Sequence, residues 1–122
     1  MSTIRANTLQ NTAGSKSVPV DTVVDGSAKA WVNFNGTGTV AIRAAFNVSS
    51  ITDNGTGDYT VNFTTALPDA NYAVVSMGRN ISNNELTTLH ASVAPTASAV
   101  RIRSQSISAY GDNEYMYIAI FR

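Results

Sequence analysis

Short runs of alternating apolar and polar residues fill the chain from about residue 27 onward. In the clearest run, residues 59–64, two aromatic residues and a valine occupy the odd positions and polar residues the even ones. A two-residue period sends successive side chains to opposite faces of a strand. Comparable runs, separated by turn-forming residues, cover residues 27–34, 39–42, 45–51, 72–77, 86–93, 99–104 and 115–121. Strands at this spacing, without a helical stretch between them, predict an all-β fold: an antiparallel, jelly-roll-like β-sandwich.

Turn-forming residues indicate where these strands reverse. Asn35-Gly36 is the dipeptide best suited to a type I′ hairpin. Residues 53–58 (Asp-Asn-Gly-Thr-Gly-Asp) predict a six-residue turn, and residues 78–85 predict a longer polar loop. The final run, residues 115–121, is apolar on both faces. That pattern is typical of a central strand or of a strand that faces another subunit.

Residues 1–26 show neither the 3.6-residue apolar period of a helix nor a sustained two-residue period. Their apolar residues are spread among Thr, Asn, Ser and Gly. Pro19 also argues against a helix in this stretch, because proline lacks a backbone donor and its ring clashes with the preceding turn. One such stretch cannot bury enough apolar surface to offset the entropy of ordering it. One interpretation is a disordered tail. The other, which the spaced apolar residues favour, is an extended arm that orders against a neighbouring subunit. We therefore divide the chain into an N-terminal arm, residues 1–26, and a head domain, residues 27–122.

Composition and charge narrow the range of partners. The chain has 122 residues, 43% of them hydrophobic and 13% charged, with 8 basic and 8 acidic residues and no cysteine. Zero net charge removes the electrostatic basis for nucleic acid or an anionic membrane as main partner. The lack of cysteine excludes disulfides and thiolate metal sites. No apolar run approaches the ~20 residues that cross a bilayer, and the start has no signal-peptide profile. An uncharged polar surface fits a component of a larger assembly.

Residues suited to catalysis or metal binding are few. The single histidine, His90, lies in a strand pattern, and the sequence has no Gly-x-Ser-x-Gly nucleophile elbow. The carboxylates fall in expected turns or in the arm, so we expect neither enzymatic activity nor a cofactor. Residues 53–58 also suit calcium, but turn geometry explains the same residues without an ion. Arg101 and Arg103 share one strand face and predict a solvated or inter-subunit salt-bridging surface.

Aromatic residues near polar turns are candidates for recognition, whereas those inside strand patterns are expected in the core. Trp31 and Phe34 are of the second kind, and we expect both to be buried. Tyr110 lies beside a Gly-Asp-Asn turn and is the best candidate for an exposed contact. Together with Asp112 and Asn113 it forms the predicted receptor contact.

Six consecutive segments form a distinctive signature over most of the first two-thirds of the chain: residues 28–34, 35–42, 43–51, 52–59, 60–63 and 67–74. Together they resemble a module that recurs in structural proteins of tailed bacteriophages, most of them tail fibre or virion appendage proteins. The opening Met-Ser-Thr-Ile-Arg-Ala-Asn-Thr-Leu-Gln-Asn-Thr-Ala-Gly is similar to the short attachment motif at the start of such fibres. A match of this length is not explained by composition.

The resemblance implies a non-enzymatic virion protein, a homotrimer made in the host cytoplasm and exposed on the particle. Its arm would dock to other virion proteins and to its own copies through Ile4, Asn7, Leu9, Val18 and Val20. Its head would be a β-rich knob, with a host surface glycan as a candidate partner. A typical fibre of this kind carries a long shaft and a distal receptor tip, whereas the organisation expected here is an arm and one domain. Two alternatives therefore stay open: a capsid decoration protein (cement or head fibre) and a carbohydrate-binding host-recognition module.

Overall fold

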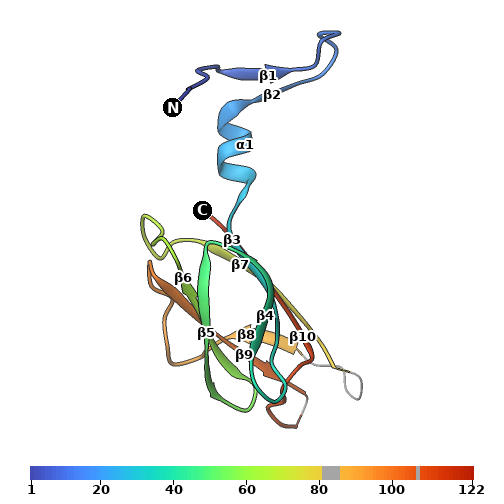
Figure 1. The fold of residues 1–122 in the computed structure, drawn as a ribbon, viewed down its shortest axis with the longest axis vertical. Helices are drawn as coiled ribbons and strands as arrows, with labels where there is room; N and C mark the ends of the chain where they lie inside the picture. Colours follow the sequence, from blue (N-terminus) through green and yellow to red (C-terminus); the bar gives the residue numbers. More distant parts are fainter. Residues whose placement is uncertain (81–85, 107) are drawn as a thin grey trace.

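Residues 1–80, 86–106 and 108–122 are described by a computed structural model, shown in Figure 1. An N-terminal arm stands on a head made of two four-stranded antiparallel sheets. The predicted antiparallel β-sandwich is therefore confirmed. Most of the polar loop predicted at residues 78–85 falls on residues 81–85, which lie outside the described residues.

The first sheet has the strand order β4-β3-β10-β7 and the second has the order β5-β6-β9-β8. The consecutive strands β3 and β4, β5 and β6, and β8 and β9 pair as hairpins, and the other connections within the head cross between the sheets. β10 lies between β3 and β7, so the final apolar run is a central strand, as predicted. The strands of the head are Ala28–Asn35 (β3), Ala41–Phe46 (β4), Val48–Gly55 (β5), Asp58–Phe63 (β6), Ala73–Arg79 (β7), Leu86–Leu89 (β8), Ala99–Gln105 (β9) and Tyr115–Phe121 (β10).

The core lies between the two sheets and is built from the inward side chains of the alternating runs. On β6, Tyr59, Val61 and Phe63 are buried, as the two-residue period predicts. Phe34 of β3 is also buried, as predicted, and meets Tyr59 edge to face with ring centroids 5.3 Å apart, a geometry that aromatic pairs prefer. The other buried apolar residues are Ala30, Val32, Leu67, Val100, Ile102, Met116, Ile118 and Ile120.

Asn47 forms the corner at which the chain leaves the first sheet for the second. Its φ of 53° lies in the left-handed region, which asparagine tolerates better than most residues with a Cβ. Its amide nitrogen donates to the carbonyls of Lys29 and Thr65, and its amide oxygen accepts the backbone N–H of Thr65. The strand runs predicted at 39–42 and 45–51 are therefore shifted: β4 continues through residues 43–46, and the break falls at Asn47.

The predicted type I′ hairpin at Asn35-Gly36 is wrong. That turn needs positive φ at both central residues, whereas the loop between β3 and β4 spans residues 36–40 and has its positive φ, 62°, at Gly38. The side-chain oxygen of Asn35 accepts the backbone N–H of Thr37 at 3.1 Å. Such an Asx-type hydrogen bond turns the chain without the two left-handed residues of a tight hairpin.

The turn predicted at residues 53–58 is shorter in the structure, because β5 continues to Gly55 and β6 begins at Asp58. Gly57 has a φ of 64°, and a Cβ at this position would lie 2.3 Å from the carbonyl oxygen of Ser104. Both the backbone conformation and the close approach require glycine. The backbone N–H of Ser104 donates to the carbonyl of Gly57 at 2.8 Å, which ties this turn to β9.

The arm is more structured than the extended segment that the sequence predicts. Two short strands, Thr8–Gln10 (β1) and Ser17–Pro19 (β2), form a hairpin, and a helix, Val20–Gly26 (α1), leads into β3. The expectation that Pro19 excludes a helix is wrong, because Pro19 occupies the N-cap with a φ of −58°. Proline is compatible with a helix start, since the first turn needs no intrahelical donor. No helix in the described residues is long and apolar enough to span a membrane.

Candidate functional site

The arm carries the predicted docking residues, and none of them is buried. Ile4 is 91% exposed and Leu9 48%, while Val18 and Val20 are half-buried. Leu9 and Val18 are register partners in the β1–β2 hairpin. The carbonyl of Asn7 accepts the backbone N–H of Val20 at 2.9 Å, so the hairpin closes onto the first residue of α1. The arm therefore has a defined backbone shape and presents apolar side chains outward.

Helix α1 also exposes apolar side chains. None of its seven residues is buried, and Val23 and Val24 are exposed. Isolated helices shorter than about 12–15 residues are marginal in water, so packing on another surface would stabilise α1. The link to the head is polar, because the ammonium group of Lys29 donates to the carbonyls of Val24 and Ser27. In Figure 1 the hairpin and α1 stand clear of the sandwich.

Tyr110 is accessible, as the sequence predicts, with 48% of its surface exposed. The guanidinium of Arg103 lies over its ring, 4.4 Å from the centroid, and also donates to its hydroxyl. The same arginine also contacts Asp58, with Nη2 3.3 Å from Oδ2, and so links Tyr110 to that carboxylate. An exposed aromatic ring that a cation holds in place is a rigid contact surface with an apolar face and a polar tip.

Asp112 and Asn113 do not form a receptor contact with Tyr110, contrary to the prediction. Asn113 is completely buried, and its amide nitrogen donates to the Ser104 hydroxyl at 2.6 Å. Asp112 is half-buried, and its carboxylate accepts the Tyr59 hydroxyl at 2.6 Å and the Gly57 backbone N–H at 2.7 Å. These turn residues instead hold one end of the sandwich together, because buried polar groups need partners.

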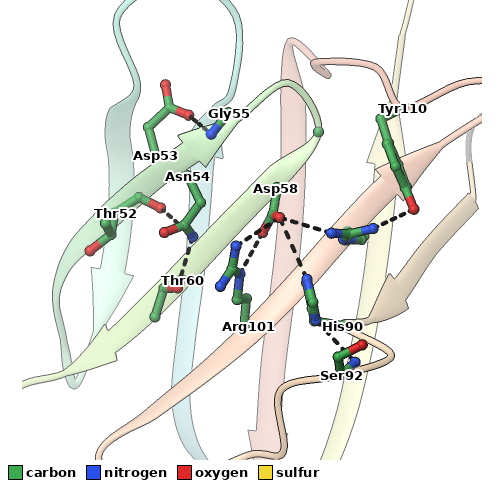
Figure 2. Close-up of polar contacts among 12 residues, drawn as sticks. Thr52, Asp53, Asn54, Gly55, Asp58, Thr60, His90, Ser92, Arg101 and Tyr110 are labelled. Carbon is green, nitrogen blue, oxygen red and sulfur yellow. Dashed lines mark hydrogen bonds and ion pairs between the residues drawn. The ribbon is translucent and has the colours of Figure 1, made fainter.

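A charged cluster on the second sheet surrounds Asp58, the first residue of β6 (Figure 2). Arg101 contacts it through two hydrogen bonds, Nε to Oδ1 at 2.7 Å and Nη2 to Oδ2 at 2.9 Å, and Arg103 Nη2 lies 3.3 Å from Oδ2. The hydrogen bond from Arg101 holds the pKa of Asp58 below its ordinary value, and it raises the pKa of Arg101. Both arginines are thus paired with a carboxylate of the same chain, a partner that the sequence pattern does not predict.

His90 belongs to the same cluster and does not form a catalytic triad. It follows β8, which ends at Leu89, before the end of the run predicted at residues 86–93. Its Nε2 lies 3.7 Å from Asp58 Oδ2, and its Nδ1 accepts the backbone N–H of Ser92 at 3.1 Å. A serine nucleophile needs a free imidazole nitrogen to take its proton. Both nitrogens of His90 already face other groups, so the arrangement orients side chains and does not activate the Ser92 hydroxyl.

The two carboxylates of the segment 53–58 have different partners. Asp53 accepts the backbone N–H of Gly55 at 2.9 Å, whereas Asp58 is held by the arginines. Across the residues that the structure describes, no three acidic or histidine side chains come close enough together to hold a metal ion. Asp53 is thus engaged within the turn and Asp58 in the ion pairs of the second sheet.

Trp31, expected in the core, is 40% exposed and lies on the outer side of β3. The alternation of the strand could have indicated this exposure, because Ala30, Val32 and Phe34 are the buried residues of the same strand. An aromatic residue between inward positions must point outward. Trp31 therefore belongs to the outer surface of the first sheet.

No protein-family model, curated protein or solved structure matches this chain. The resemblance to phage appendage modules, and the docking role drawn from it, therefore remain predictions. The structural features that bear on function are the unburied arm, the exposed Tyr110 and the outer surfaces of the two sheets.

Proposed function

We propose that this chain is a bacteriophage virion structural protein of the tail fibre or appendage class, anchored to the particle by its arm and exposing the β-sandwich. One observation carries the proposal: the arm has a folded backbone, yet none of its apolar residues is buried. A segment of this kind fits a docking role. The similarity of residues 1–14 to the attachment motif of phage fibres supports the same role.

The chemistry of the arm suits a protein partner. Its exposed apolar side chains include Ile4, Leu9, Val23 and Val24, and each would contribute on the order of 1–2 kcal/mol when buried. Fixing the backbone costs about 1–2 kcal/mol per residue, so burial must be extensive to hold the arm. A shell protein that covers the arm, or several arms bundled together, would supply that burial.

In this proposal the protein acts by binding, without catalysis and without a cofactor. Its copies form a homotrimer on the outside of the virion, with their arms held by other virion proteins. A capsid decoration protein would use the same arm and differ only in the position that it occupies on the particle.

The experiment that tests the proposal measures incorporation into particles. Particles purified from infected cells are analysed by quantitative mass spectrometry for the wild-type chain and for the double variant Ile4→Ser, Leu9→Ser. The control replaces the exposed Thr3 and Thr12 of the same arm by serine. We expect the variant to be depleted at least ~10-fold, because it lacks two apolar side chains that docking would bury. The control should match the wild type. Absence of the wild-type chain from particles, or equal incorporation of the variant, would reject the proposal.

A second candidate function, carbohydrate recognition at the host surface, is favoured by the exposed ring of Tyr110 beneath Arg103. On a glycan array the wild-type chain should bind and Tyr110→Ala should not, because the ring supplies the contact area. Ser108→Ala, in the same exposed loop, is the matched control. A wild-type chain that binds no glycan, or a Tyr110→Ala variant that binds equally well, removes this candidate.

A further inference from the structure

The outer surface of the first sheet is apolar over two neighbouring rows of side chains. One row joins Val75, Ala119, Trp31 and Phe46 in register, and the other joins Met77 and Tyr117 to Asn33, which is its polar member. Val75 is 61% exposed and Met77 67%, so these side chains gain little from the sandwich itself. We define the apolar face as the outward residues Trp31, Phe46, Val75, Met77, Tyr117 and Ala119.

The middle of the apolar face is a hollow that offers little to a polar ligand. Its volume is about 380 Å³, and Trp31, Met77 and Tyr117 are among its lining residues. Asn33 contributes a polar side chain, but the Oδ1 atom is buried by its neighbours and has no hydrogen-bond partner among the described residues. Sites for sugars or other polar small molecules need several convergent hydrogen-bonding groups. The hollow therefore suits an apolar side chain better than a glycan.

Charged groups flank this surface at both ends and are already engaged. At the end near α1, the ammonium group of Lys29 donates to the carbonyls of Val24 and Ser27. The other end carries two arginines. The guanidinium of Arg43 lies 4.2 Å and that of Arg79 5.4 Å from the centroid of the Tyr115 ring. Arg43 also donates to the carbonyl of Glu114 at 2.6 Å. The second sheet differs, because its outward Asp58 is paired with arginines of the same chain. An apolar centre with a polar rim is the usual layout of a protein–protein interface.

We propose that the apolar face packs against a second copy of this chain. Five of its side chains, all but Ala119, are 40–67% exposed. Taking roughly 150–250 Å² for each whole residue, they present about 500 Å² of mostly apolar surface. A standard interface buries about 800 Å² on each partner, of which roughly 60% is apolar, again about 500 Å². The apolar face is therefore large enough to supply the apolar part of one such interface.

Charge and chain direction favour a second copy as the occupant. The formal net charge of the chain is zero, so two copies approach without net repulsion. Helix α1 leads directly into β3, which carries Trp31. In a cyclic assembly with its axis along the strands, copies that meet through the apolar face bring their α1 helices to the same end, where Val23 and Val24 are exposed. The inference deepens the proposed function by naming the surface through which copies associate.

The first experiment measures the mass of the full chain in solution by analytical ultracentrifugation over a range of concentrations. We compare the wild type with Val75→Glu and Met77→Glu, which place a carboxylate in the apolar face. The matched control is Leu86→Glu on β8 of the second sheet, where the leucine is 63% exposed. We expect a wild-type oligomer, a rise of at least ~100-fold in the dissociation constant for each face variant, and an unchanged control. Circular dichroism checks that each variant is folded, and the use of two variants keeps the test valid if one is not.

The second experiment needs no variant, because Trp31 is the single tryptophan of the chain and belongs to the apolar face. Its emission should shift to the red, and its quenching by acrylamide should increase, over the same dilution that dissociates the oligomer. At ~100 µM even a weak interface would form. A wild-type chain that stays monomeric at this concentration therefore overturns the proposal and indicates that a different protein covers the apolar face. An oligomer that Val75→Glu and Met77→Glu do not weaken, or that Leu86→Glu weakens equally, also overturns it. These readouts are independent of particle incorporation, so this inference and the proposed function can fail separately.

Discussion

The arm and the head contain the same kinds of apolar residue with opposite results. In the head, the valines and isoleucines of β3, β6, β9 and β10 are enclosed between two sheets. Within residues 1–29, all of which the structure describes, no residue is buried. A sheet or helix buries its apolar side only where a second layer covers it, and the arm has a hairpin and a short helix without such a layer. Apolar content alone therefore does not decide burial, and the presence of a covering layer does.

The largest expected contrast comes from replacing the same residue type in both regions. Ile102→Ala in the core should lower the free energy of unfolding by about 3–4 kcal/mol, because it leaves a cavity between the sheets. Ile4→Ala in the exposed arm should change it by less than ~0.5 kcal/mol. Urea unfolding followed by far-UV circular dichroism measures both values. A large loss of unfolding free energy in Ile4→Ala would mean that the arm packs on the head in solution, which would contradict the contrast between arm and head.

A second contrast uses two glycines with the same backbone conformation. Gly57 in the head has a φ of 64° and Gly14 in the arm a φ of 70°, but a Cβ would clash with Ser104 only at Gly57. Gly57→Ala should cost about 2–3 kcal/mol of unfolding free energy, the sum of left-handed strain and the clash. Gly14→Ala should strain the hairpin locally and leave the unfolding of the head unchanged. Equal losses in the two variants would contradict the separation of arm and head.

The third contrast concerns carboxylates. Asp58→Asn should cost about 1–3 kcal/mol, because Arg101 and Arg103 would then face each other without their counter-ion. The exposed Asp21 of α1 is the matched residue in the arm, and Asp21→Asn should change stability by less than ~0.5 kcal/mol.

The pH dependence of the Asp58 contribution follows from the direction of its pKa. Its pKa is lowered in the folded chain, mainly by the hydrogen bond from Arg101, so its contribution is present above the ordinary value of 3.8 and is lost progressively as the pH falls below that value. The stability gap between wild type and Asp58→Asn should therefore narrow on acidification. A gap that is constant or widens would contradict the ion-pair account.

The smallest effect is expected at the exposed pair of Asp69 and Arg122. Hydrogen bonds from Arg122 lower the pKa of Asp69 to about 2. Arg122→Gln should return it toward 3.8 with little change in stability at neutral pH, because exposed ion pairs are screened by solvent. A carboxyl NMR titration measures the shift, and Arg5→Gln in the arm is the control. An unchanged titration of Asp69 in the Arg122→Gln variant would show that the pair does not form in solution.

The elements that sequence reasoning predicted well are those defined by local period. β6 and β10 lie within about one residue of their predicted bounds, since alternation is a property of neighbouring residues. The wrong predictions concern features that are determined by contacts between residues far apart in the sequence. Nothing near Asn113 in the chain indicates that it bonds Ser104, and Asp58 and Arg101 are 43 positions apart. The sequence pattern does not predict the corner at Asn47, because its left-handed backbone is stabilised by Lys29 and Thr65, both remote in sequence.

The sequence by itself determined the all-β class, the buried side of β6 and β9 and the contrast between arm and head, because these depend on the order of apolar and polar residues. Only the tertiary structure decided which turn residues are committed to the core, which arginines share a carboxylate, and that the outward side chains of four strands join into one apolar surface. Those features depend on which strands lie side by side, and strand pairing brings together residues far apart in the chain. The local pattern determines which way a side chain points, and the packing of the sheets determines what it contacts.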